Sequence, residues 1–174
     1  MKFSEEKLRL FAAPLSETED QKCKNAIGMV RDALKDIGFT DDGKTIEKLY
    51  ADTYSYSLEM RNATKNRKVK LFVKGSYANN TNVRTESDVD IAVVLESTFK
   101  VKYRPNINDA KYGFSNSTDN VMTFKDDVED ALRKKFGSDV ERKNKSIKIH
   151  GNTYRVDADA VPCMRHRDYS IDYN

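Results

Sequence analysis

Apolar residues recur at helical intervals near the start of the chain. Between Ser16 and Gly38 they are three or four residues apart, as on one face of a helix, at Cys23, Ile27, Val30, Leu34 and Ile37. Ser16 and Glu19 have the spacing of a capping box, and glycine commonly follows the last turn of a helix. The pattern predicts a helix over residues 16–37.

Two further stretches are predicted to be helical. Residues 46–62 are expected to form a second helix. Tyrosine and threonine residues lower its helix propensity, so the pattern does not define where this helix begins and ends. Residues 123–136 are expected to form a third helix that Gly137 ends. The apolar stripe of this third helix consists of Val128, Ala131, Leu132 and Phe136.

The pattern changes to strands in the middle of the chain. Residues 68–74 alternate between lysine and apolar positions except at Phe72, which is typical of a half-buried strand. Residues 88–96 are rich in β-branched residues without helical spacing, so they are predicted to form another strand. Residues 97–120 are polar and irregular, and a loop of that length is expected to be functional or mobile.

A hairpin is predicted near the end of the chain. Ile147 and Ile149 precede the turn dipeptide Gly151-Asn152, and residues 153–161 then form the second strand. Pro162 is expected to end that strand. The order of helices and strands predicts an α+β fold. A length of 174 residues suits one main domain.

Composition excludes several classes of protein. The chain has 31 basic and 28 acidic residues, and a net charge of +3 does not require a nucleic-acid partner. No apolar stretch approaches the length of a membrane span, and acidic residues stand where a signal peptide would be basic and then apolar, so a cytoplasmic protein is expected. Cys23 and Cys163 lack the spacing of a metal site and are expected to be reduced thiols.

The candidate chemistry lies in residues 75–90. Gly75 follows a strand and allows the backbone to approach a phosphate closely, while Ser76 offers a hydroxyl and an N–H as donors. Asp88 and Asp90 are two residues apart, so in a strand both carboxylates point to one face. Two neighbouring anions need a compensating cation, and oxygen ligands of this kind suit Mg²⁺.

Phosphoryl transfer with two metal ions needs a third acid. Asp157 and Asp159 are both candidates, because a period of two again aims both carboxylates at one face of a strand. Each of these acids could equally face solvent. The residues alone therefore leave the choice of the third carboxylate open.

The stretch GSYANNTNVRTESDVD resembles the signature of the DNA polymerase β-like nucleotidyltransferases. Together with the later VDADAVPC, it is similar to the bacterial cGAS/DncV-like nucleotidyltransferases, or CD-NTases, which make cyclic oligonucleotide signals in anti-phage defence. The resemblance covers about residues 71–95 and 153–163. It implies a mixed central sheet with flanking helices. It also implies that residues 1–174 are a catalytic domain lacking most of a C-terminal helical domain, which would leave the activity of this chain incomplete.

The resemblance also implies roles for individual residues. Gly75 and Ser76 would hold the triphosphate, and Asp88 and Asp90 would bridge two Mg²⁺ ions, or Mn²⁺ in their place. Asp159 would be the third carboxylate, since an apolar pair and a proline follow it, with Asp157 as the rival. Nucleoside triphosphates would be the substrates, and a separate effector would bind the cyclic product.

Two other functions remain open at this point. The chain is compatible with a nucleotidyltransferase that modifies another acceptor, such as a protein, an antibiotic or an RNA end. It is also compatible with a nucleotide-binding module that does not catalyse a reaction. Intact acids at positions 88, 90 and 159 favour catalysis, because neighbouring carboxylates repel each other and are not expected to be retained where no metal ion binds.

Overall fold

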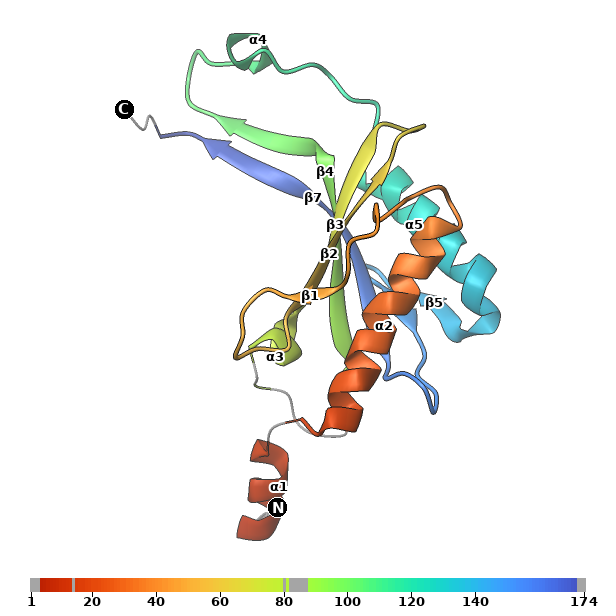
Figure 1. Cartoon of the computed structure of the whole chain (residues 1–174). Coiled ribbons are helices and arrows are strands. Elements are labelled where there is room, and N and C mark those ends of the chain that lie inside the picture. The colour runs from red at the N-terminus through yellow and green to blue at the C-terminus, as the bar shows by residue number, and fades with distance from the viewer. Residues whose placement is uncertain (1–3, 14, 80, 82–87, 172–174) are drawn as a thin grey trace.

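The computed structural model describes residues 4–13, 15–79, 81 and 88–171. A seven-stranded sheet in the order β1-β2-β3-β4-β7-β6-β5 has the long helices α2 and α5 against one face (Figure 1). β4 and β7 run parallel, and the other neighbouring pairs of described strands are antiparallel. The helices are α1 (Glu5–Ala12), α2 (Glu17–Lys35), α3 (Gly75–Ala78), α4 (Asp109–Tyr112), α5 (Val121–Phe136) and the 3₁₀ turn η1 (Gly137–Asp139). The strands are β1 (Glu47–Lys48), β2 (Tyr56–Asn62), β3 (Arg67–Lys74), β4 (Val89–Tyr103), β5 (Val140–Arg142), β6 (Ile147–Ile149) and β7 (Ala158–Tyr169).

The predicted first helix is confirmed as α2. Ser16 is its N-cap, and the Glu19 carboxylate accepts the Ser16 N–H at 2.8 Å, which completes the capping box. The apolar stripe is buried in the core at Cys23, Ile27, Val30 and Leu34. Ile37 lies beyond the helix and is only partly buried. Capping and periodicity therefore act together to place α2 on the sheet.

The predicted third helix is confirmed as α5, which begins two residues earlier than expected. The Asn120 side chain caps it by accepting the N–H groups of Met122 and Thr123. Gly137 follows the helix with a φ of +56°, a conformation that favours glycine. α5 contacts α2 and β7, so the two long helices form one layer over the sheet.

The prediction of a helix over residues 46–62 is wrong. Most of this range is a turn followed by β2, which pairs with β3 in an antiparallel hairpin. Along β2 buried positions alternate with more exposed ones, so the period is two and not three or four. Leu58 and Met60 are good helix formers, but pairing with β3 and burial in the hydrophobic core outweigh that local preference.

The predicted central strands are confirmed as β3 and β4. Residues 97–120, however, are less irregular than expected, because β4 continues to Tyr103 after a bulge and stays paired with β7. The short helix α4 follows. Its Tyr112 ring stacks on Tyr103 and on Tyr169 of β7. The alternation of Phe99, Val101 and Tyr103 with lysines was the overlooked strand signal.

The predicted hairpin is confirmed only in its pairing. β6 and β7 are antiparallel neighbours, but residues 150–157 form the connection in place of a two-residue turn. Arg155, which is buried, organises that loop by donating to the His150 carbonyl at 3.0 Å and pairing with Asp139 at 2.9 Å. Pro162 does not end β7. β6 pairs with β7 only as far as Ala160, so the missing N–H of Pro162 interrupts no hydrogen bond to β6.

Two expectations from composition can be compared with the structure. Within the described parts of the chain, no helix is long and apolar enough to cross a lipid bilayer. Cys23 and Cys163 are both free thiols, as expected, and burial is the main cause that raises the pKa of Cys23 to about 12. Cys23 therefore behaves as a core residue.

Candidate active site

Asp90 and Asp159 lie side by side on the face of the sheet opposite α2 and α5. They are direct partners in the parallel pairing of β4 with β7. Val89 and Ile91 flank Asp90 and have no exposed surface, which fixes β4 in the core. Because side chains alternate along a strand, the carboxylate of Asp90 points away from the helices. The side of the sheet opposite α2 and α5, which carries Asp90 and Asp159, is named the open face.

A row of four charges crosses the open face at this level. Lys74 of β3 pairs with Asp90 of β4, Asp90 with Asp159 of β7, and Asp159 with Lys148 of β6. Two acids are thus flanked by two lysines on four consecutive strands. Like charges directly opposite each other destabilise a sheet, and the outer lysines offset that repulsion.

The electrostatics of Asp90 show that the compensation is incomplete. Burial is the largest cause of a raised Asp90 pKa, and the charges of Asp159 and Asp88 raise it further. Lys74 acts in the opposite direction but does not cancel these effects. A cation placed between the acids would favour their ionised forms. The arrangement therefore suits the binding of a further positive charge.

Gly75 brings the backbone directly against Asp90. Its φ is +72°, and a Cβ atom at this position would lie 2.3 Å from Asp90 Oδ2, so a side chain cannot be accommodated without displacing the carboxylate. Ser76 follows in α3, and its carbonyl accepts the Thr81 N–H at 2.9 Å. Tyr77 is buried and hydrogen-bonds Cys23 of α2, which anchors this turn to the helix layer. The predicted phosphate turn thus lies next to the acids.

Asp88 and Asp157 share one lysine. Lys148 Nζ lies 2.9 Å from Asp88 Oδ2 and 2.8 Å from Asp157 Oδ2. The Lys148 hydrogen bond is the largest cause of a lowered Asp157 pKa, and the Gly151 N–H acts in the same direction. Asp159 has a different partner, since it accepts a hydrogen bond from Ser146 Oγ at 3.2 Å. Asp157 precedes β7, so the two acids expected on one strand have distinct environments.

The donor set fits a hard divalent cation, because three carboxylates, Asp88, Asp90 and Asp159, gather at one end of β4 and β7. Among the described residues, no group of three acidic, histidine or cysteine side chains has the geometry of a preformed metal site. Asp88 is paired with Lys148 instead. The Asp88 side chain is 37% exposed, which leaves it room to rotate toward a cation.

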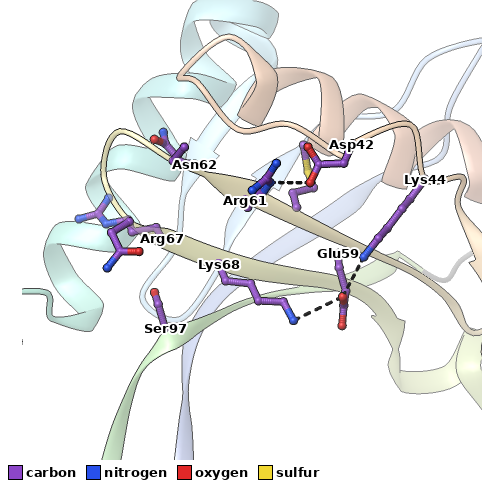
Figure 2. A pocket seen from close by; sticks show the side chains of 11 residues that line it. Asp42, Lys44, Glu59, Arg61, Asn62, Arg67, Lys68 and Ser97 are labelled. Atoms are coloured by element: carbon purple, nitrogen blue, oxygen red, sulfur yellow. Dashed lines mark hydrogen bonds and ion pairs between the residues drawn. The ribbon is translucent and has the colours of Figure 1, made fainter. Parts of the chain in front are cut away.

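A separate pocket lies at the other end of β2 and β3, and Figure 2 shows the side chains that line it. Its charges are already paired within the protein. Glu59 Oε2 lies 3.1 Å from Lys44 and 3.4 Å from Lys68, and Asp42 pairs with Arg61 at 2.6 Å. None of the five candidate site residues lines this pocket. It is therefore not the centre around which the acids gather.

Comparison with known proteins decides the family. Residues 57–165, from β2 into β7, match the nucleotidyltransferase domain family. This chain is a nucleotidyltransferase domain. The matched range contains Gly75, Ser76, Asp88, Asp90 and Asp159.

Relatives of this nucleotidyltransferase domain are cyclic nucleotide synthases by name. Over 99% of its length it is 51% identical to cyclic GMP-AMP synthase CdnE03 of Staphylococcus schleiferi, of which it covers 53%. The structure of Rhodothermus marinus CdnE c-UMP-AMP synthase with Apcpp and Upnpp matches 97% of this chain and 47% of its own, with a TM-score of 0.64 and 25% identity. The structure of Elizabethkingia meningoseptica CdnE cyclic dinucleotide synthase with GTP and Apcpp matches 94% of this chain and 45% of its own, with a TM-score of 0.55 and 35% identity.

These matches confirm the expected resemblance to CD-NTases and the polymerase β-like α+β fold. The chain spans about half the length of the curated relatives it matches. The site roles of Gly75, Ser76 and the three acids stay predictions. The signature residues 80 and 82–87 between them lie outside the described residues.

Lys74 and Lys148 are the site residues of this nucleotidyltransferase domain that sequence reasoning missed. Lys148 had a local signal, since it stands between Ile147 and Ile149 and must point away from the core on which they pack. Lys74 likewise alternates with Val73 at the end of β3. The pairing of β6 with β7, which brings Lys148 to Asp159, was not visible in either pattern.

Proposed function

We propose that this domain catalyses the metal-dependent joining of nucleoside triphosphates into a cyclic oligonucleotide, with release of pyrophosphate. One observation carries the proposal: the Gly75 turn, Asp90 and Asp159 meet on neighbouring strands of the open face. The similarity to named cyclic nucleotide synthases supports this class of product. Residues 1–174 are proposed to form the catalytic domain, with a helical domain outside this range completing the nucleotide pocket.

The proposed reaction is an in-line displacement at phosphorus. A ribose 2′- or 3′-hydroxyl oxygen of one nucleotide forms a bond to the α-phosphorus of a second. The bond between that phosphorus and the bridging oxygen of the β-phosphate breaks, and its electron pair leaves with pyrophosphate. Asp159 is proposed to help remove the hydroxyl proton, because it is the acid held directly beside Asp90.

The acids and the glycine turn divide the remaining tasks. Asp88, Asp90 and Asp159 are proposed to hold two Mg²⁺ ions, for which Mn²⁺ can substitute. When bound, such ions neutralise phosphate charge and favour the ionised hydroxyl. The backbone at Gly75 and the Ser76 hydroxyl are proposed to bind the triphosphate, since glycine leaves this backbone accessible beside Asp90.

The proposal extends to the setting of the enzyme. We infer a cytoplasmic enzyme that uses nucleoside triphosphates without a nucleic-acid template, consistent with a net charge of only +3. The cyclic product is proposed to be bound by a separate effector in anti-phage defence. The resemblance of the central motif to CD-NTases supports this last step.

Product analysis with matched acid variants tests the proposal. The protein is incubated with mixed nucleoside triphosphates and Mg²⁺, and pyrophosphate and nucleotide products are followed. We expect Asp88→Asn, Asp90→Asn and Asp159→Asn to lower product formation by about 10³-fold. Asp157→Asn should lower it by about tenfold or less, because Asp157 contacts Lys148 and not Asp90. Asp52→Asn, at an exposed turn, is the control.

Calorimetry with a non-hydrolysable triphosphate separates the alternatives. Metal-dependent binding without product would favour a nucleotide-binding module. Pyrophosphate release that needs an added protein, antibiotic or RNA would select a different acceptor. If the protein forms no nucleotide product and also shows no metal-dependent binding of any triphosphate, the proposal is contradicted.

A further inference from the structure

Lys148 is the lysine of the open face that forms ion pairs with two acids, Asp88 and Asp157. Its ammonium bridges Asp88 and Asp157 at 2.9 and 2.8 Å, and its side chain is 20% exposed. Ile147 and Ile149 on either side have at most 1% of their surface exposed. The core thus fixes the register of β6, and the ammonium of Lys148 is held at the acids by the fold.

The two carboxylates that Lys148 bridges are held differently. Asp157 also accepts the Gly151 N–H, and its own carbonyl accepts the N–H of Val89 at 2.9 Å, so it is tied to the loop before β7 and to β4. Asp88 has Lys148 as its side-chain partner among the described residues. The link from Lys148 to Asp157 is therefore part of a fixed frame, whereas the link to Asp88 can be exchanged.

We propose that Lys148 is an exchangeable counter-cation: it holds Asp88 until a divalent ion binds there and then remains on Asp157 alone. This inference rests on the proposed function, because Asp88 must be a metal ligand for the exchange to occur. An ammonium and a divalent ion repel each other and use the same carboxylate oxygens. When the Lys148 ammonium leaves Asp88, it keeps its ion pair with Asp157.

The exchange assigns different roles to the two acids near the start of β7. Asp159 faces Asp90 and is available to a metal ion, whereas Asp157 anchors Lys148. Lys148 is then a positioning residue that weakens metal binding and protects the acids from mutual repulsion. Asp157 affects metal binding only through Lys148.

Direct measurement of Mn²⁺ binding tests the exchange without turnover. Calorimetry without nucleotide compares the wild type with Lys148→Met, Lys148→Arg and the control Lys145→Met, which changes an exposed lysine in the turn before β6. We expect Lys148→Met to bind Mn²⁺ about tenfold more tightly, because a competing charge has been removed. Lys148→Arg keeps the charge and should resemble the wild type. Equal or weaker binding by Lys148→Met than by Lys145→Met would overturn the proposal.

Thermal unfolding gives a second measurement on the same variants. In EDTA, Lys148→Met should have a lower Tm than Lys145→Met, because Asp88 and Asp157 lose their shared cation. Added Mn²⁺ should raise the Tm of Lys148→Met more than that of the wild type. If Lys148 had a purely structural role, Mn²⁺ would raise the Tm by the same amount in all variants. That result would also contradict the exchange.

A double variant tests whether Asp157 anchors Lys148 or binds the metal ion itself. The single variant Asp90→Asn tests the proposed metal site separately from the exchange. If Asp157 acts only through Lys148, then Asp157→Asn combined with Lys148→Met should bind Mn²⁺ as Lys148→Met does. Weaker binding by the double variant would make Asp157 a metal ligand and overturn its role as an anchor. If wild type and Asp90→Asn bind Mn²⁺ equally or not at all, the proposed metal site itself fails.

Discussion

The two faces of the central sheet use the same strands for different purposes. On β3, Val69, Leu71 and Val73 point toward α2 and α5 and are fully buried, whereas Lys74 and Phe72 lie on the open face and are partly exposed. Packing dictates nearly every residue on the covered face. The open face is less constrained by packing, so charged side chains can gather there at a modest cost in stability.

The same division continues on the two strands that hold the acids. Ile91 and Ala160 are buried without exposed surface, while their neighbours Asp90 and Asp159 stand on the open face. A one-residue change of register would place both acids in the core and both apolar residues outside. The core residues therefore hold the acids in position, although they take no part in the proposed chemistry.

The largest expected effect tests this difference on neighbouring residues of β3. Leu71→Ala should lower the free energy of unfolding by about 2–5 kcal/mol, because Leu71 is fully buried and truncation leaves a cavity. Phe72→Ala should cost about 1 kcal/mol or less, since the Phe72 side chain lies on the open face. Equilibrium unfolding in urea measures both. Equal losses would mean that the open face is covered in solution.

A smaller effect concerns the contact between the Gly75 turn and the open face. Gly75→Ala should cost about 3 kcal/mol, from the positive φ and from the clash with the Asp90 carboxylate. Gly43→Ala is the matched control, because Gly43 has a φ of +78° with nothing within 4 Å of the added Cβ. It should cost about 1–2 kcal/mol, from strain alone. If both variants lose the same stability in urea, the Asp90 contact is not restrictive.

The smallest expected effect concerns Glu129 of α5, on the helix side of the sheet. Its pKa is shifted in the opposite direction to that of Asp90 on the open face. Burial would raise the Glu129 pKa, but hydrogen bonds from Arg142 and Arg133 outweigh it and lower the pKa below its ordinary value. Its stabilising contribution is therefore present at neutral pH and lost as the pH falls through the lowered pKa. Glu129→Gln should cost about 1 kcal/mol at pH 7 and less near pH 3, because the contribution declines as the pH falls below the ordinary pKa of a glutamate. A difference in unfolding free energy that stays constant between these pH values would contradict this assignment.

Local sequence patterns predicted the elements whose structure depends on near neighbours. The Ser16 and Glu19 capping box and the stripe that follows were sufficient for α2, and alternation was sufficient for β3. Residues 46–62 failed because Leu58 and Met60 suit either a helix or a strand, and their pairing partner lies in β3. The prediction that Pro162 ends its strand was wrong for a similar reason, because the effect of a proline depends on which strands lie beside it.

By itself, the sequence determined the local arrangement of the central motif. The spacing of Asp88 and Asp90 and the glycine before Ser76 are local features that any strand and turn would present together. Only the tertiary structure decided which acid near the start of β7 stands beside Asp90, and which cation meets Asp88 from 60 residues away. Strand order and register set these distances, and both depend on the burial of one face of the sheet against α2 and α5.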